Sequence, residues 1–225
     1  MPFIGSPRKL ANMPPRRLHL VRHGEVHNPD GILYGRIPGY RLSERGERMA
    51  RVSADSMSDV TIGRLYASPL ERAQQSAEPW AEKYDLEIRT EPRIIEPWNA
   101  FEGRKFDLKA SLRKPSEWRL IAYPTKPSWG EANDAMAGRV VAAMEDAWDE
   151  LEESGEDGDI VMVMHQAPIW ITHRYLAGQR LWHDPRKRRC ALSSITSFRR
   201  ENGRFVETGY ADPAADIARI DTGAV

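Results

Sequence analysis

The chain has 225 residues, of which 40% are hydrophobic and 29% are charged, as is ordinary for a globular enzyme. Its 33 Lys and Arg residues balance its 33 Asp and Glu residues, which argues against bulk binding to nucleic acid or to an anionic membrane. The single cysteine, Cys190, excludes an intrachain disulfide and favours a reducing, cytoplasmic compartment, and no apolar run approaches the length of a transmembrane helix.

Residues 1–16 differ in composition from the rest of the chain. They include Arg8, Lys9 and Arg16 but no acid, and they lack the continuous apolar core of a secretory signal. We expect a flexible arm there rather than a functional basic tail.

From residue 17 onward the pattern alternates between strand and helix, which predicts a single α/β domain over residues 17–210. In its first half the expected elements are a strand at 17–21, a helix at about 43–56, a strand at 62–68, a helix that starts at Ser68-Pro69, and a strand at 86–90. Pro79 should kink or end the second helix, because proline lacks an amide hydrogen.

The segment 97–129 interrupts this alternation. It carries four prolines and three of the seven tryptophans of the chain. Such a segment is typical of a functional lid or insertion, and the alternative is a packed excursion that covers the sheet.

The second half returns to the alternating pattern. It predicts a helix at about 130–154, a strand at 159–164, a helix at 168–177 that Gly178 ends, and a hairpin with Asn202-Gly203 in its turn. Residues 211–225 are small and polar, and we expect a mobile tail there.

Polar residues follow four of the predicted strands. Arg22 and His23 follow the first strand, Arg72 the second, Glu96 the third and His165 the fourth. Each of them alone has an ordinary structural explanation. Because ligands bind outside the carboxyl ends of the strands in open α/β sheets, their recurrence at equivalent ends predicts one shared site.

Two arginines and two histidines at one end of a sheet suit a phosphoryl group. Guanidinium groups bind phosphate oxygens in pairs and stay charged, and a neutral imidazole can attack phosphorus. A protonated second imidazole can stabilise the equatorial oxygens, and a carboxylic acid can protonate the departing alkoxide. The set needs no metal ion and no cofactor, and the remaining histidines show no zinc-binding spacing.

The motifs around these residues resemble the histidine phosphatase superfamily, in its phosphoglycerate mutase-like branch. The likeness runs in order from Leu18 to Ala177, through "LVRHGE", "YGRIPGYRLSERGERMA", "ASPLERAQQSAEP", "PRIIE" and "VMVMHQAPI". It implies an α/β fold, a three-layer α/β/α sandwich with a mostly parallel central sheet.

The resemblance also implies a role for each matching residue. His23 would be the phosphorylated nucleophile and Glu96 the proton donor. The phosphate pocket would be completed by Arg22, Arg72 and His165, with Asn28 beside it.

The sequence departs from the family pattern in the loop after Glu96. There "EPWNAFEG" keeps Glu102 but at a shorter spacing, so Glu102 is a rival for the acid. Gln166-Ala167 replace the usual glycine pair, and the match of "SWGEA" to a family helix start suggests that Glu131 also faces the pocket.

Segments that true mutases of the family carry are absent after "RHGE" and after the acid, which favours a phosphatase acting on a small phosphomonoester. The alternatives are a mutase that returns the phosphoryl group to an acceptor and a non-catalytic phosphate-binding module. The basic run Arg186–Arg189 either reaches the site and favours a polyanionic substrate or is a solvated loop. The sequence does not indicate the physiological substrate or the oligomeric state.

Overall fold

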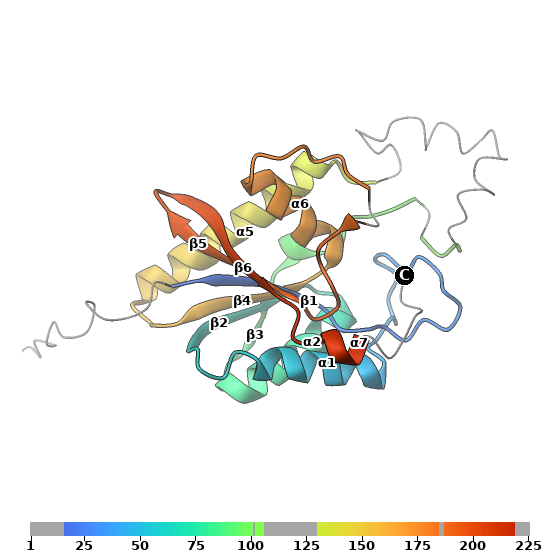
Figure 1. Ribbon diagram of the computed structural model, residues 1–225, viewed down its shortest axis with the longest axis horizontal. Coiled ribbons are helices and arrows are strands. Elements are labelled where there is room, and N and C mark those ends of the chain that lie inside the picture. Colours follow the sequence, from blue (N-terminus) through green and yellow to red (C-terminus); the bar gives the residue numbers. More distant parts are fainter. Residues whose placement is uncertain (1–15, 101, 106–129, 185–186, 219–225) are drawn as a thin grey trace, which may run out of the picture.

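The computed structural model describes residues 16–100, 102–105, 130–184 and 187–218. Figure 1 shows them as a central sheet with helices on both faces. The six strands lie in the order β3-β2-β4-β1-β5-β6. The first four in this order are parallel, β5 is antiparallel to β1, and β6 is antiparallel to β5. This confirms the predicted α/β sandwich with a mostly parallel sheet.

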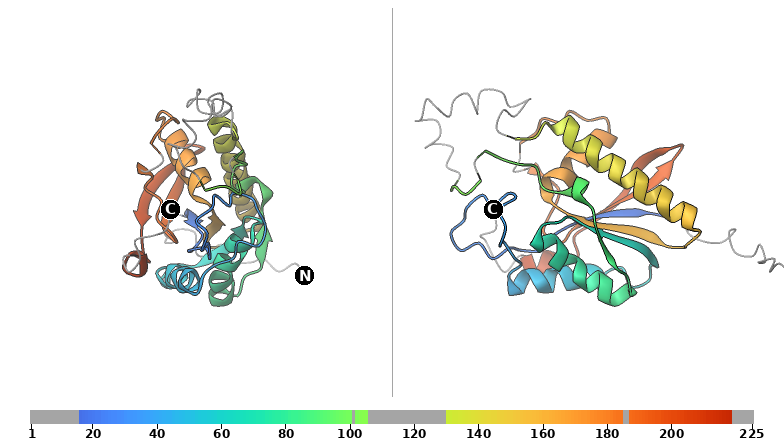
Figure 2. Two further views of the ribbon diagram at one scale, coloured as in Figure 1. Left: turned by 90° about the vertical axis from the view of Figure 1, so that its right-hand side faces the viewer. Right: turned by 180° about the vertical axis from the view of Figure 1, so that it is seen from behind.

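The strands span β1 Leu18–Arg22, β2 Ile62–Ala67, β3 Ile88–Thr90, β4 Asp159–Met164, β5 Ile195–Glu201 and β6 Arg204–Ala211. Helices α1 (Glu44–Asp55) and α2 (Glu71–Tyr84) lie on one face of the sheet, and α5 (Asn133–Ser154) and α6 (Gln166–Leu176) lie on the other (Figures 1 and 2). The short elements are a 3-10 turn, η1 (Pro92–Ile94), and helix α7 (Ala215–Ala218).

The core consists of two apolar layers that β4 separates. Ile160, Met162 and Met164 pack with the residues of α5 and α6, whereas Val161 and Val163 pack with those of α1 and α2. A parallel strand that is buried on both faces needs apolar residues at successive positions, which explains the sequence "DIVMVM" of β4. Because β1, β2 and β4 are parallel neighbours, the residues that follow them emerge at the same end of the sheet.

The second helix begins later than predicted, and Pro79 does not end it. The helix begins at Glu71 rather than at Ser68-Pro69, because the hydroxyl of Ser68 contacts His165 instead of capping the helix. It also continues through Pro79 to Tyr84 and ends where Asp85 adopts φ 53°. The neighbouring Trp80 is completely buried against the sheet, and burial of this size offsets the roughly 3 kcal/mol that an interior proline costs.

The hairpin prediction is confirmed, since Asn202 and Gly203 join β5 to β6 with φ values of 50° and 74°. Helix α6 begins two residues earlier than expected, at Gln166. The ordered chain continues beyond the expected boundary at residue 210, with α7 and the fully buried Ala214.

Residues 1–15 and 219–225, and most of the predicted lid at 97–129, lie outside the described residues. In the part of the chain that is described, no helix is long and apolar enough to cross a membrane.

Candidate active site

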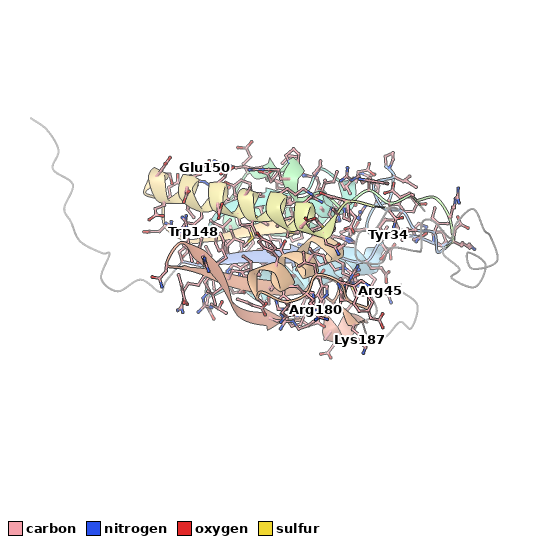
Figure 3. The ribbon with its side chains drawn as sticks, turned by 90° about the horizontal axis from the view of Figure 1, so that it is seen from above. Tyr34, Arg45, Trp148, Glu150, Arg180 and Lys187 are labelled. Carbon is pink, nitrogen blue, oxygen red and sulfur yellow. The ribbon has the colours of Figure 1, made fainter. Side chains whose placement is uncertain are left out.

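The structure brings the predicted polar residues together at the carboxyl end of the parallel strands. His23 directly follows β1, and its amide donates to the Met164 carbonyl at the end of β4 (3.0 Å). His165 is the next residue after β4, and its ring centroid lies 5.2 Å from that of His23. Figure 3 shows Tyr34 toward one end of the molecule and Trp148 and Glu150 of α5 toward the other. The site lies at the Tyr34 end of the molecule, because the guanidinium carbon of Arg72 lies 4.8 Å from the centroid of the Tyr34 ring.

His23 is held with one ring nitrogen bonded and the other unoccupied. Its Nδ1–H donates to the Gly24 carbonyl at 2.7 Å, which leaves the lone pair on Nε2. Burial, and then the charges of Arg72 and Arg22, lower the pKa of His23 well below 6.5. The ring is therefore neutral near pH 7 and has a nucleophilic nitrogen.

Gly24 lets the backbone behind His23 pass close to helix α1. A Cβ on Gly24 would lie 2.3 Å from the carbonyl oxygen of Gly46, so no larger residue fits there. The Gly24 amide donates to the Ser76 hydroxyl at 3.0 Å, which ties the same turn to α2. Two helices thus fix the position of His23.

Arg22 and Arg72 each use one guanidinium nitrogen to bind the backbone and leave another without a partner. Arg22 Nη1 donates to the Cys190 carbonyl at 2.7 Å, and Arg72 Nη2 donates to the Gly35 carbonyl at 2.8 Å. The Nε atoms of both side chains are buried without a hydrogen-bond partner. A buried donor without a partner is costly, so these two atoms indicate a place where an anion binds.

His165 presents a third buried nitrogen without a partner. Its Nε2 lies 2.7 Å from the Ser68 hydroxyl, and that hydroxyl already accepts a hydrogen bond from the Leu70 amide (3.5 Å). The Ser68 hydroxyl can donate to His165 Nε2, and in that tautomer the ring hydrogen is on Nδ1, the unpartnered atom. Burial, and then the Arg72 charge, lower the pKa of His165, so it is a neutral donor before an anion binds.

Glu96 lies beside His165, with Oε2 3.6 Å from Nδ1. Burial raises the pKa of Glu96, and the positive charges of Arg72, Arg188 and Arg22 oppose that rise. Burial therefore favours the protonated form of the Glu96 carboxyl group and the neutral form of the His165 ring. A protonated carboxyl group in a phosphate site is suited to act as a general acid.

Glu102, the rival acid, has a different environment. Its Oε1 accepts a hydrogen bond from the Asn99 amide (3.1 Å), and its carboxyl group lies against Gly35. Gly35 in turn supplies the carbonyl that Arg72 binds. Glu102 therefore supports the loop that orients Arg72.

Asn28 and Glu131 bind protein groups. The Asn28 side chain bonds both the amide and the carbonyl of Ile32 and so closes its own loop. Glu131 forms a two-pronged ion pair with Arg139 (2.7 Å for each bond) and lies 3.9 Å from Arg36. These contacts fix the positions of both side chains.

The structure adds Arg188 to the residues near the site, whereas the sequence analysis did not distinguish it from the other members of the basic run. Arg188 contacts Gln166, the residue after His165, and its charge acts on Glu96. In the sequence Arg188 was only one of the four basic residues of the run Arg186–Arg189. Arg186 itself lies outside the described residues. A signal was available in Gln166, where the family's usual glycine is replaced by a side chain long enough to bind Arg188.

Three other histidines, His19, His173 and His183, have structural partners. Both nitrogens of the buried His19 are bonded, one to Ser197 (2.8 Å) and one to Asp159 (3.0 Å). Among the described residues no group of three His, Cys, Asp or Glu side chains is arranged to hold a metal ion. The positive charge at the site comes from guanidinium groups.

Comparison with known proteins supports the family resemblance of the sequence. The family model described as "Histidine phosphatase superfamily (branch 1)" matches residues 18–213. The chain is 45% identical over 200 residues to Rv0525 of Mycobacterium tuberculosis, which covers 88% of this chain and 97% of that protein. It is 30% identical over 166 residues to phosphoserine phosphatase 1 of Hydrogenobacter thermophilus, covering 72% of this chain and 76% of the relative.

Among solved structures, mycobacterial glucosyl-3-phosphoglycerate phosphatase Rv2419c superposes with a TM-score of 0.70 at 21% identity. The superposition covers 86% of this chain and 97% of that one, and it supports the fold.

Proposed function

Because this chain belongs to the histidine phosphatase superfamily, branch 1, we propose that it is a phosphomonoester phosphatase that works through a phosphohistidine on His23. One observation carries the proposal. His23 is buried with Nε2 unoccupied, its ring lies 5.2 Å from that of His165, and the charges of Arg72 and Arg22 lower its pKa. Arg22 Nε, Arg72 Nε and His165 Nδ1 are buried donor nitrogens without a partner. This arrangement provides a nucleophile for phosphorus and ligands for its oxygens.

In the first step His23 Nε2 attacks phosphorus, and the bond between phosphorus and the ester oxygen breaks. Glu96 gives its proton to that oxygen, so the leaving group departs as an alcohol. Arg22, Arg72 and His165 Nδ1–H bind the three equatorial oxygens, whose charge the two guanidinium groups balance without a metal ion.

In the second step water attacks the phosphohistidine. The Glu96 carboxylate, now ionised, takes a proton from the water, the N–P bond breaks and inorganic phosphate leaves. His23 returns to its neutral form with Nδ1–H still bonded to the Gly24 carbonyl.

Hydrolysis is favoured over mutase chemistry by the sequence, which lacks the two segments that mark true mutases of the family. A relative at 30% identity is named a phosphoserine phosphatase, which also supports hydrolysis of a small phosphomonoester. The single cysteine supports a cytoplasmic site of action.

The test is turnover of a broad panel of phosphomonoesters, followed by trapping of the phosphoenzyme. We expect release of inorganic phosphate from the wild-type protein, and after a rapid alkaline quench an acid-labile label that is absent in His23→Ala. The exposed His27, on the same loop, supplies the matched control His27→Ala, which should behave as wild type.

Two results would replace the proposal. A label that builds up and needs a bisphosphate primer, with the phosphoryl group recovered on an acceptor, would mean a mutase. Binding of phosphate without turnover of any ester would mean a non-catalytic module.

A further inference from the structure

The backbone segment that ends at Glu96 is held at both ends by arginine side chains. Arg139 of α5 donates from Nη1 to the Arg93 carbonyl. Arg36, from the loop between β1 and α1, donates from Nε to the carbonyl of Glu96 itself at 2.5 Å. Between these two carbonyls Ile94 is completely buried in the apolar layer that contains the inner face of α5. The chain that leads to the proposed general acid is therefore fixed in place.

One carboxylate contacts both of these arginines. Glu131 accepts from Nε and Nη2 of Arg139, each at 2.7 Å, and its Oε2 lies 3.9 Å from Nη2 of Arg36. The side chain of Glu131 is only 16% exposed. Because a two-pronged contact fixes the plane of a guanidinium group, it also fixes the direction of the remaining nitrogen. In Arg139 that nitrogen is Nη1, which binds the Arg93 carbonyl.

Glu131 is itself placed close to the chain that follows Glu96. The residue before it, Gly130, forms an isolated antiparallel bridge with Asn99. A Cβ on Gly130 would lie 3.1 Å from the Trp98 carbonyl oxygen, so the two backbones approach closely here. Glu131 thus connects the chain after the acid to the arginines that hold the chain before it.

Asp146, a second carboxylate near the same segment, has a different kind of contact. It lies on α5, it is 68% exposed, and it binds the side chain of Arg93 at 2.5 Å rather than an arginine that holds the backbone. Arg93 also binds Glu91 at 2.7 Å. Exposed ion pairs contribute little to stability, so Asp146 serves as the matched control for Glu131.

Building on the proposed function, we propose that Glu131 positions the general acid Glu96. It aligns the guanidinium groups of Arg139 and Arg36 with the two backbone carbonyls that hold the segment of the acid. Glu131 is a positioning residue, because it acts on the acid only through these arginines. Its negative charge also balances theirs.

The charges around Glu96 give this arrangement a second measurable consequence. The ionisable groups that act on Glu96 or lie beside it come from α2, α5, the ends of β1 and β4, and two loops: Arg72, Arg139, Arg22, His165, Tyr34 and Arg188. Burial raises the pKa of Glu96, and the Arg139 charge is one of those that oppose the rise. Loss of the Glu131 charge should therefore lower the pKa of Glu96, and loss of the Arg139 charge should raise it further.

The test uses two substitutions that share one effect and differ in the other. Glu131→Gln and Arg139→Gln both disturb the contact with the Arg93 carbonyl. Each should lower kcat/KM for an alkyl phosphate by about ten- to hundredfold, since a misplacement of about 1 Å can cost about 10²-fold. Turnover of p-nitrophenyl phosphate should fall only a few-fold, because nitrophenolate leaves without a proton.

The alkaline fall in alkyl kcat/KM separates the two variants. The protonated carboxyl group of Glu96 is the active form, so the fall should move to lower pH in Glu131→Gln and to higher pH in Arg139→Gln. Asp146→Asn should match the wild type in both rates and in the pH profile. A general loss of stability would not shift the profile in opposite directions.

Hydrogen exchange provides a measurement that does not need turnover. The amides of Ile94 and Ile95 form the hydrogen bonds of η1 (3.3 Å each), and their exchange should be at least about tenfold faster in Glu131→Gln and Arg139→Gln, with the amides of β4 unchanged. Faster exchange in a protein that hydrolyses no ester would sink the proposed phosphatase and support the role of Glu131 in holding this segment. Alkyl turnover and exchange that both match the wild type in Glu131→Gln, or equal losses on alkyl and aryl substrates, would overturn the inference.

Discussion

Replacing Glu96 by glutamine should separate substrates by their leaving groups. The substitution removes the proton that an alkyl leaving group needs, whereas p-nitrophenolate leaves readily without one. General acid catalysis typically contributes about 10²–10⁴-fold, so kcat/KM for an alkyl phosphate should fall by about that factor. The corresponding rise in the activation barrier is roughly 3–5 kcal/mol.

The structure explains why the aryl substrate is a clean reference. Burial raises the pKa of Glu96 and so favours its uncharged acid form, whose charge and shape a glutamine amide reproduces. Within the described residues the side chain of Glu96 forms no hydrogen bond that holds the fold, and Arg36 binds its backbone carbonyl (2.5 Å). Hydrolysis of p-nitrophenyl phosphate should therefore stay within a few-fold of wild type.

The pH dependence of the wild-type enzyme tests the same assignment. Glu96 must be protonated, and its raised pKa extends the active form toward higher pH before alkyl turnover falls. His23 must be neutral, and its lowered pKa places the loss of activity in acid well below pH 6.5. The alkaline fall in kcat/KM should be larger for alkyl than for aryl substrates and should disappear in Glu96→Gln.

Glu102→Gln is the control. Glu102 supports the loop whose Gly35 carbonyl binds Arg72, so its loss should affect both substrates alike. If Glu102→Gln shows the leaving-group selectivity and Glu96→Gln does not, the acid is Glu102, and the reasoning from burial is refuted.

Three further predictions concern the phosphate ligands. Arg72→Lys should lower kcat/KM at least tenfold, because the compact ammonium group lacks the planar, separated donors by which Nη2 binds the Gly35 carbonyl while Nε stays available for phosphate; near-normal kinetics would count against it. Ser68→Ala should lower kcat/KM about tenfold, because the hydrogen bond to His165 Nε2 no longer keeps the ring hydrogen on Nδ1, and the melting temperature should change little. An unaltered kcat/KM would show that Ser68 has no role in the site. Dialysis against a chelator should leave turnover intact, because arginines supply the charge; recovery only on adding Mg²⁺ would contradict this.

The sequence by itself determined the order of the elements and the residues delivered to the site. The apolar run "DIVMVM" predicts a strand buried on both faces, and the polar residues after β1 and β4 had to meet because parallel neighbours end at the same side. These properties depend on side-chain pattern and chain direction, which are local.

The tertiary structure decided the protonation states and the partners. Whether Glu96 or Glu102 keeps a proton depends on burial and on arginines from distant segments, so the "EPWNAFEG" spacing left both open. The sequence predicted Ser68 as a helix cap, whereas in the structure its hydroxyl is hydrogen-bonded to His165, 97 residues later in the chain. Arg188 and Arg189 are identical neighbours in sequence, and only the positions of Gln166, His183 and Glu207 give them different hydrogen-bond partners. Desolvation and hydrogen-bond partners are properties of the assembled environment, and a linear pattern does not contain them.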